Sequence, residues 1–339
     1  MTAGAVTPLR RRLAAAVLAF GTLALSACLF APLVGSTRIS LARALDRTVP
    51  FADNVDAQIF FVARLPRTLA AALVGAALAS AGVVLQALLR NPLASPFTLG
   101  VSAGAALGAM LAITFASATV VSGLSVVPVS AFAGSLGAVV IVYALSTVKR
   151  RGLSTEVLLL AGVTLNAFFS ALILFVQYFA DATRTLQTVR WLMGDLDVGG
   201  YGPIVAALPM LLIAGAGFAL LPRSLNLLSL GAESAAARGV DVLQAQRLAF
   251  FSASVATGAA VSLGGPVGFV GIIVPHLVRL LVGADHRLVL PAAALFGAAF
   301  LVGCDVVARV ALAPLELPVG IVTAVLGGPF FVWLLVRLR

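Results

Sequence analysis

Long apolar stretches, separated by short polar segments, run through almost the whole chain. The clearest example lies between Arg67 and Arg90, where no charged residue occurs. As a helix, a stretch of this length crosses the roughly 30 Å apolar layer of a bilayer. The charge-free stretches predict ten membrane-spanning helices, with ends defined to within a few residues. The ten predicted spans cover residues 13–35, 68–89, 97–116, 126–148, 157–180, 203–221, 248–263, 267–282, 288–312 and 318–336.

Three features of this pattern are less sharply defined. The break between the third and fourth spans depends on weak turn signals in residues 117–125. Only Gly264-Gly265-Pro266 separates the seventh span from the eighth, so one of these two spans could be a short helix. The first span follows Arg10-Arg11-Arg12 and could be a cleaved signal peptide, but it exceeds the usual apolar core of about 7–15 residues. A retained signal-anchor helix is therefore favoured.

The composition points to the same class of protein. Hydrophobic residues make up 61% of the 339 residues and charged residues only 10%, whereas about a quarter of a typical soluble domain is charged. The expected fold is an all-α integral membrane protein, a single transmembrane domain over residues 1–339. Cys28 and Cys304 lie in separate apolar stretches without metal or redox spacing and predict no disulfide. The net charge of +10 does not indicate nucleic-acid binding, because the basic residues are scattered between spans without aromatic platforms beside them.

The positions of lysine and arginine predict the orientation. With ten spans and both termini in the cytoplasm, the inner connections carry fourteen basic and four acidic residues. The outer connections carry eight of each. The whole positive excess then lies on one side of the membrane, as the positive-inside bias requires.

Small residues recur four apart on two of the predicted helices. One face carries Ala71, Gly75 and Ala79, and another carries Gly100, Gly104 and Gly108. Such faces let helix backbones approach closely in lipid, where burying apolar surface gives no gain over lipid tails. They predict tight helix packing and by themselves indicate no function.

No catalytic, metal-binding or nucleotide-binding motif occurs in the sequence. The two histidines, His276 and His286, have neither HExxH spacing nor a nearby cysteine pair. The single lysine, Lys149, follows Val148, which excludes the Gly-Lys-Ser/Thr of a P-loop. No cofactor is expected, and ATP-driven transport would need a separate ATPase.

Asp305 is the one clear carboxylate inside a predicted span, and such a group is typical of proton-coupled secondary transporters. Arg309 follows four residues later on the same helical face, so an intrahelical ion pair is the simpler interpretation. A secondary transporter and a structural membrane subunit without transport stay open as alternatives to an ATP-driven importer.

Short motifs in a fixed order carry a family resemblance. The first block runs from Arg64-Leu65-Pro66-Arg67 to Arg90-Asn91-Pro92-Leu93-Ala94-Ser95-Pro96 and on to Leu99-Gly100-Val101-Ser102-Ala103-Gly104. Further motifs are LLLAGV at 158–163, WLMG at 191–194, LGAE at 230–233, RGV at 238–240, GPVGFVGIIVPH at 265–276, GADHR at 283–287, ELPVG at 316–320 and GPF at 328–330. In their joint order over residues 64–337 these motifs resemble the FecCD family, the permeases of bacterial importers for iron–siderophore, haem and cobalamin. Residues 1–60, the N-terminal helix and its periplasmic connection, carry little of the resemblance.

The resemblance implies one half of a homodimeric permease in a type II ABC importer of the bacterial inner membrane. Two copies would form the translocation path, with two ATP-binding cassette ATPase subunits beneath and a periplasmic substrate-binding protein above. Ten spans per subunit is the family's arrangement. The substrate would be a metal chelate, with ferric siderophore, haem and cobalamin all open, because family members leave discrimination to the binding protein.

The longest cytoplasmic connection, residues 223–241, is the expected ATPase contact. Ser234-Ala235-Ala236-Ala237 favours a helix, and Gly231 and Gly239 are expected to end it. By the family pattern, the ATPase-coupling residues are Gly231, Ala232, Glu233, Arg238 and Gly239. Without the resemblance, this connection would be interpreted as an ordinary surface loop.

Arg64, Arg67 and Arg309 fall at the periplasmic ends of their predicted spans, against the positive-inside tendency. They match positions where family members receive acidic side chains of the binding protein. Arginine suits this role because its fork binds carboxylates bidentately. The competing interpretation is that they reach lipid headgroups or pair locally with Asp305.

Four further positions match the family's cytoplasmic gate: Asn91, Leu93, Thr155 and Glu156. Glu156 departs from the small hydroxyl residue expected there, which leaves the shape of this gate open. Gln86, Asn166 and Gln177 are polar groups inside predicted spans. They could line the path, or they could form hydrogen bonds between helices.

Overall fold

The computed structural model describes residues 8–116, 119–121, 124–147 and 155–337, and the described part is almost entirely helical. Seven helical segments have the length and apolar composition to cross a bilayer, among them the 34-residue segment Val55–Leu88. Each of the ten predicted spans corresponds to one apolar helix. These are α1 (Leu9–Phe30), α4 (Leu65–Leu88), α5 (Val101–Ala116), α6 (Val126–Thr147), α7 (Thr155–Gln177), α9 (Gly202–Leu220), α12 (Val242–Gly264), α13 (Val270–Val282), α14 (His286–Val310) and α15 (Val319–Arg337).

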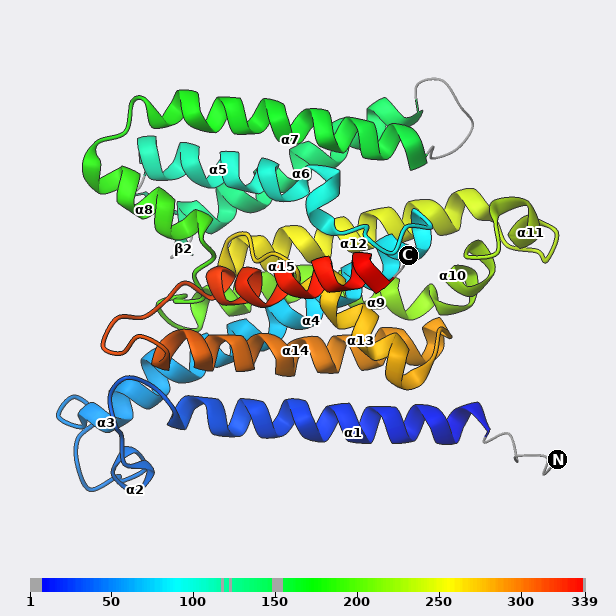
Figure 1. Cartoon of the computed structure of the whole chain (residues 1–339). Coiled ribbons are helices and arrows are strands. Elements are labelled where there is room, and N and C mark those ends of the chain that lie inside the picture. Colours follow the sequence, from blue (N-terminus) through cyan, green and yellow to red (C-terminus); the bar gives the residue numbers. More distant parts are fainter. Residues whose placement is uncertain (1–7, 117–118, 122–123, 148–154, 338–339) are drawn as a thin grey trace.

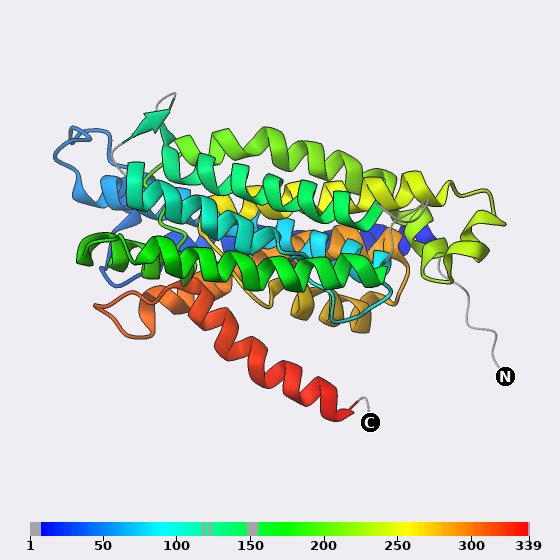
Figure 2. The ribbon, with the colours of Figure 1, turned by 90° about the horizontal axis from the view of Figure 1, so that it is seen from above.

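The long helices form a bundle around α4 (Figures 1 and 2). Almost every residue of α4 beyond its first turn is buried, because α12, α13 and α14 pack around it. Helix α1 lies along α14 at one side of the bundle, and α5, α6 and α7 lie together at the opposite side (Figure 1). Helix α15 diverges from the bundle toward its C-terminal end (Figure 2).

Glycines allow the closest contacts, as the small-residue faces predict. A Cβ added at Gly75 would lie 2.2 Å from the carbonyl oxygen of Gly297 on α14. One added at Gly108 would lie 2.1 Å from the carbonyl oxygen of Ser130 on α6. Both distances are far below van der Waals contact, so backbone meets backbone at these crossings. The prediction of tight helix packing is confirmed.

Short elements gather at the two ends of the bundle (Figure 1). One end carries η1 (Ala31–Leu33), α2 (Leu41–Ala44), α3 (Val55–Gln58), the π-helical turn η2 (Ile59–Arg64), the hairpin of β1 (Val120–Val121) and β2 (Leu124–Ser125), and α8 (Ala182–Leu192). The other end carries α10 (Pro222–Leu228) and α11 (Ala232–Ala236). The basic residues predicted to face the cytoplasm lie at the α10–α11 end wherever they are described.

Several predicted helix ends differ from those of the structure. The second span extends without interruption to Val55, because Pro66 sits in the first turn of α4, where it removes no intrahelical bond. The third span divides into a short turn, η3 (Pro96–Leu99), and α5, because Gly100 adopts a left-handed conformation with φ +78°. Of the seventh and eighth spans, the eighth is the short one.

The sequence pattern does not predict α8, which lies between the fifth and sixth predicted spans. Asp181 caps this helix by accepting the backbone N–H of Arg184 at 2.8 Å. Four of the predicted inner basic residues lie outside the described part of the chain, namely Lys149, Arg150, Arg151 and Arg339.

Candidate functional site

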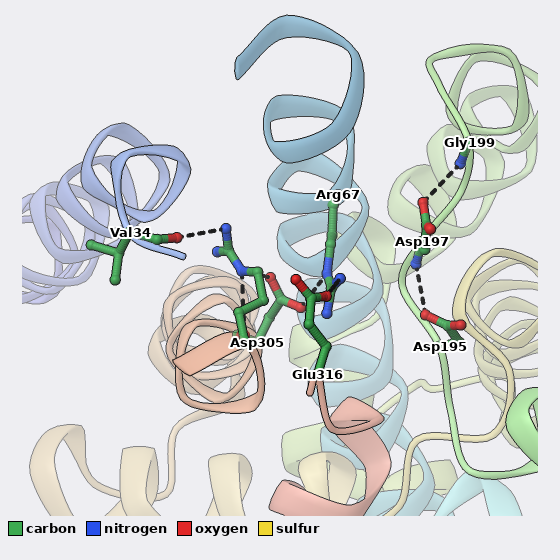
Figure 3. Close-up of polar contacts among 8 residues, drawn as sticks. Val34, Arg67, Asp195, Asp197, Gly199, Asp305 and Glu316 are labelled. Atoms are coloured by element: carbon green, nitrogen blue, oxygen red, sulfur yellow. Dashed lines mark hydrogen bonds and ion pairs between the residues drawn. The ribbon is translucent and has the colours of Figure 1, made fainter. Parts of the chain in front are cut away.

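An ionic cluster lies at the α2–α3 end of the bundle and joins α4, α14 and the loop before α15 (Figure 3). Nε of Arg67 contacts Oδ1 of Asp305 at 2.8 Å, and Nη1 of Arg67 contacts Oε2 of Glu316 at 2.5 Å. Nε of Arg309 lies 3.1 Å from Oδ2 of Asp305. The predicted intrahelical pair between Asp305 and Arg309 is therefore present, and Arg67 joins it from a different helix. The two oxygens of the buried Asp305 carboxylate thus contact two different guanidinium groups.

The burial of the cluster decreases outward. Asp305 has no exposed surface and Arg309 is 1% exposed. The side chain of Arg67 is 12% exposed, whereas that of Glu316 is 41% exposed. The inner pair is screened little by water, so it is held strongly, while the Arg67–Glu316 contact faces solvent on the Glu316 side. Glu316 is consequently the most accessible member of the cluster.

Two of the three predicted docking arginines are bound to the backbone that follows α1. Arg64 donates through Nη1 to the carbonyl oxygen of Pro32 at 3.2 Å and through Nη2 to that of Thr37 at 2.5 Å. Arg309 donates through Nη1 to the carbonyl oxygen of Val34 at 3.0 Å (Figure 3). A Cβ at Gly35 would lie 2.5 Å from the Arg64 guanidinium, so a larger residue there would require this side chain to shift. These contacts hold the backbone of residues 32–37, which follow α1, against α4 and α14.

In this conformation, therefore, all three arginines have internal partners. Arg67 and Arg309 pair with Asp305, as the competing interpretation anticipated, whereas Arg64 binds backbone carbonyl oxygens instead. Docking by these arginines stays a prediction. Glu316 was not singled out among the candidate residues, because its sequence position after α14 gives no signal of a contact with a residue 249 positions earlier.

The predicted gate residues lie on two separate segments. Helix α4 ends in a Schellman motif: the Arg90 N–H donates to Ala87 and the Asn91 N–H donates to Gln86, with Arg90 at φ +47°. Oδ1 of Asn91 accepts the backbone N–H of Leu93 at 2.9 Å, which closes the next turn. Thr155 and Glu156 begin α7, and Glu156 is exposed. A gate role for these residues stays a prediction.

The predicted coupling segment forms the short helix α11 between two glycines. Gly231 has φ +112° and Gly239 has φ +80°, conformations that L side chains rarely adopt. Ala235 is fully buried and packs with Leu228 of α10 and Ala245 of α12. The helix projects at the end of the bundle (Figure 1), while Glu233 and Arg238 are exposed. The local helix expected from the sequence is present.

The polar residues inside the spans mostly bind other helices. Nε2 of Gln86 donates to the carbonyl oxygen of Gly271 at 3.0 Å, and its Oε1 accepts from Nη1 of Arg279. Nδ2 of Asn166 donates to the carbonyl oxygen of Phe97 at 2.9 Å. Gln177 is half-buried at the end of α7. Interhelical hydrogen bonding, the alternative to a path-lining role, is observed for Gln86 and Asn166.

In the described residues, no group of three or more His, Cys, Asp or Glu side chains is placed to hold a metal ion. The two cysteines are free. The clusters that the structure builds are therefore ionic and hydrogen-bonded contacts between helices.

Comparisons with known proteins agree on one family. The model of the FecCD transport family matches residues 22–337. The chain is 46% identical over 273 residues to the cobalamin import system permease protein BtuC of Halobacterium salinarum, covering 80% of this chain and 72% of that protein. It is 42% identical over 278 residues to the hemin transport system permease protein HmuU of Yersinia pestis, covering 81% and 82%. A solved structure described as an inward-facing conformation of a metal-chelate type ABC transporter superposes with a TM-score of 0.81 at 34% identity, covering 95% of this chain and 98% of that one.

Proposed function

This chain belongs to the FecCD transport family and is a membrane-spanning permease subunit of an ABC importer; on that basis we propose that it imports a metal chelate, namely ferric siderophore, haem or cobalamin. The relatives' printed names support the haem and cobalamin classes, because a cobalamin and a hemin permease are both more than 40% identical to it. The chain itself performs no catalysis. Membership implies ATPase and substrate-binding partners in general.

The specific assembly we propose has two copies of this chain in the bacterial inner membrane, two ATPase subunits and one periplasmic binding protein. The α10–α11 end faces the cytoplasm, because it carries the positive excess. Both chain termini are then cytoplasmic. Gln177 is the proposed path-facing polar group, since Gln86 and Asn166 bind neighbouring segments, and Asn91, Leu93, Thr155 and Glu156 are the proposed gate. Residues 223–241 are the proposed cytoplasmic coupling segment.

The observation that carries the ATPase contact is the projecting helix α11 between two glycines. A short helix packed on α10 and α12 through Ala235 can transmit motion from a partner to the bundle. The exposed Glu233 and Arg238 offer charges of both signs to that partner. The basic end of the bundle is the side where a cytoplasmic ATPase must bind.

Replacing Gly239 with valine tests this contact. Because Gly239 has φ +80° and no other atom within 4 Å of an added Cβ, the change disturbs the backbone conformation without a steric clash. Gly199 is the matched control, since it also has positive φ (+64°) with open space around it but lies at the opposite end. In proteoliposomes containing the ATPase and the binding protein, Gly239→Val should uncouple ATP hydrolysis from uptake of haem or cobalamin. Equal uptake by both variants would contradict the assignment.

For the outer face, we propose that Arg67 receives a carboxylate of the binding protein by exchange for Glu316. Arg67 is the only one of the three docking arginines that contacts a substantially exposed side chain, Glu316, whereas Arg64 and Arg309 bind backbone carbonyl oxygens at this end. An incoming carboxylate in place of Glu316 would leave the charge of the cluster unchanged, so the exchange needs no new buried charge. Arg64 and Arg309 would support this position from below through their bonds to the backbone of residues 32–37.

A further inference from the structure

Asn226 of α10 binds the first residues of α14. Its Nδ2 donates to Oδ1 of Asp285 at 2.7 Å, and its Oδ1 accepts the backbone N–H of His286 at 2.9 Å. The same Oδ1 lies 2.7 Å from Nδ1 of His286. Because an amide oxygen can only accept, Nδ1 of His286 must carry its proton in this arrangement. One amide side chain thus holds two consecutive residues of another segment.

The receiving side of this contact is itself fixed. Asp285 caps α14 by accepting the backbone N–H of Arg287 at 3.0 Å, and Nη2 of Arg287 contacts Oδ2 of Asp285 at 2.7 Å. His286 is only 6% exposed. Asp285 cannot turn away from Asn226 without losing its contacts with Arg287, and burial restricts His286. Asn226 therefore binds the start of a helix whose side chains are already held in place.

The donating side leads directly to α11. Leu230 lies four positions after Asn226, and Gly231 then begins the turn into α11. Leu228 of α10, two residues after Asn226 in the chain, packs with Ala235 of α11. Helix α10 therefore lies between the proposed ATPase contact and the start of α14 (Figure 1).

Helix α14 continues from this contact to the far end of the bundle. It is a single helix of 25 residues, and Asp305 and Arg309 of the ionic cluster lie in its last two turns. A helix of that length spans about 37 Å. Although Pro291 removes one intrahelical hydrogen bond near its start, α14 is one continuous helix that connects the region beside α11 with the cluster around Arg67.

We propose that Asn226 is a positioning residue for energy coupling, tying α10 to the start of α14 so that movement at α11 is carried by α14 to the ionic cluster. This inference rests on the proposed function, in which α11 contacts the ATPase. Asn226 lies within the proposed coupling segment 223–241, but neither the family motifs identified in the sequence nor the individual candidate residues include it. Its chemistry fits the role because an amide supplies both the donor that Asp285 needs and the acceptor that the His286 N–H needs.

The test compares Asn226→Asp with the exchange Asn226→Asp/Asp285→Asn. The single variant keeps the shape of the side chain but places a second carboxylate against Asp285. The double variant restores one donor and one acceptor with their positions exchanged, and asparagine still caps α14. Ser229→Ala is the matched control on α10, since it removes only the bond from Ser229 Oγ to the backbone of Asn226.

The measurement is the ATPase activity of the assembled importer in nanodiscs, with and without its binding protein. We expect Asn226→Asp to lower the stimulation by the binding protein about tenfold, the effect of losing a hydrogen bond to a charged group. The double variant should regain most of the stimulation, and Ser229→Ala should retain it. The ATPase subunits should co-purify with all three variants.

Full stimulation in Asn226→Asp would overturn the proposal. So would loss of ATPase co-purification in that variant, or a double variant that regains thermal stability without regaining stimulation, because Asn226 would then simply maintain the fold. A double variant as inactive as the single one would show that the hydrogen-bonded link is not what matters. Gly239→Val distinguishes failure of this inference from failure of the proposed function. If stimulation is lost in Gly239→Val but kept in Asn226→Asp, only the role of Asn226 is refuted. If stimulation is kept in both variants, the coupling role of α11 is refuted as well.

Discussion

Replacing Glu316 with glutamine should strengthen the docking of the binding protein. In the structure Oε2 of Glu316 contacts Nη1 of Arg67 at 2.5 Å, so a carboxylate of the binding protein must first displace Glu316 from Arg67. A hydrogen bond between charged groups contributes about 1.5–3 kcal/mol. Because the Glu316 side chain is 41% exposed, solvent screening reduces this to about 1 kcal/mol. Glutamine keeps an acceptor oxygen but loses the charge, so binding should tighten by up to about fivefold.

The assay is the equilibrium affinity between the purified binding protein and this permease in nanodiscs, at fixed ionic strength. Asp53→Asn is the control, since Asp53 is an exposed acidic residue at the same end of the bundle and its loss changes the net charge equally. Arg67→Gln should weaken binding, because it removes the proposed receiving group. Affinity that is unchanged or weaker in Glu316→Gln would refute the exchange, and equal tightening in Asp53→Asn would attribute the effect to general electrostatics.

Three further outcomes are expected. Gly82→Ala should lower thermal stability by about 1–3 kcal/mol, because its Cβ would lie 2.1 Å from the carbonyl oxygen of Gly271, whereas Gly137→Ala, with nothing within 4 Å, should be nearly neutral in the same melting experiment. Asp305→Asn should lower the free energy of unfolding by about 3 kcal/mol, because it leaves buried arginines without their anion, yet uptake should stay ATP-driven. Substrate accumulation that is driven by a pH gradient in vesicles without ATPase, and is abolished by this variant, would contradict the importer assignment. The hydrogen bond from Arg287, followed by that from Asn226, lowers the pKa of Asp285 below its usual value of 3.8. The contribution of Asp285 to folding stability should therefore be complete above that pH and lost on further acidification. Asp285→Asn should remove this part of the acid transition in a pH series of melting curves.

The sequence by itself determined the membrane class, the ten helices and the local contacts. Charge-free stretches mark the spans because a charged side chain is costly in lipid. The Asp305–Arg309 pair was predictable because residues four apart meet on any helix. The helix α11 was predictable because alanines favour a helix and glycines end one. The family motifs added the importer assignment, which composition alone could not supply.

Only the tertiary structure decided which distant residues meet. Arg67 lies 238 positions from Asp305, and Asn226 lies 59 positions from Asp285. A predicted span is apolar on all sides, because lipid and neighbouring helices both accept apolar side chains, so its sequence does not reveal which face meets which helix. The arginines at the outer face illustrate the consequence. Their charge and position were evident from the chain, whereas their internal partners depended on how α1, α4 and α14 pack together.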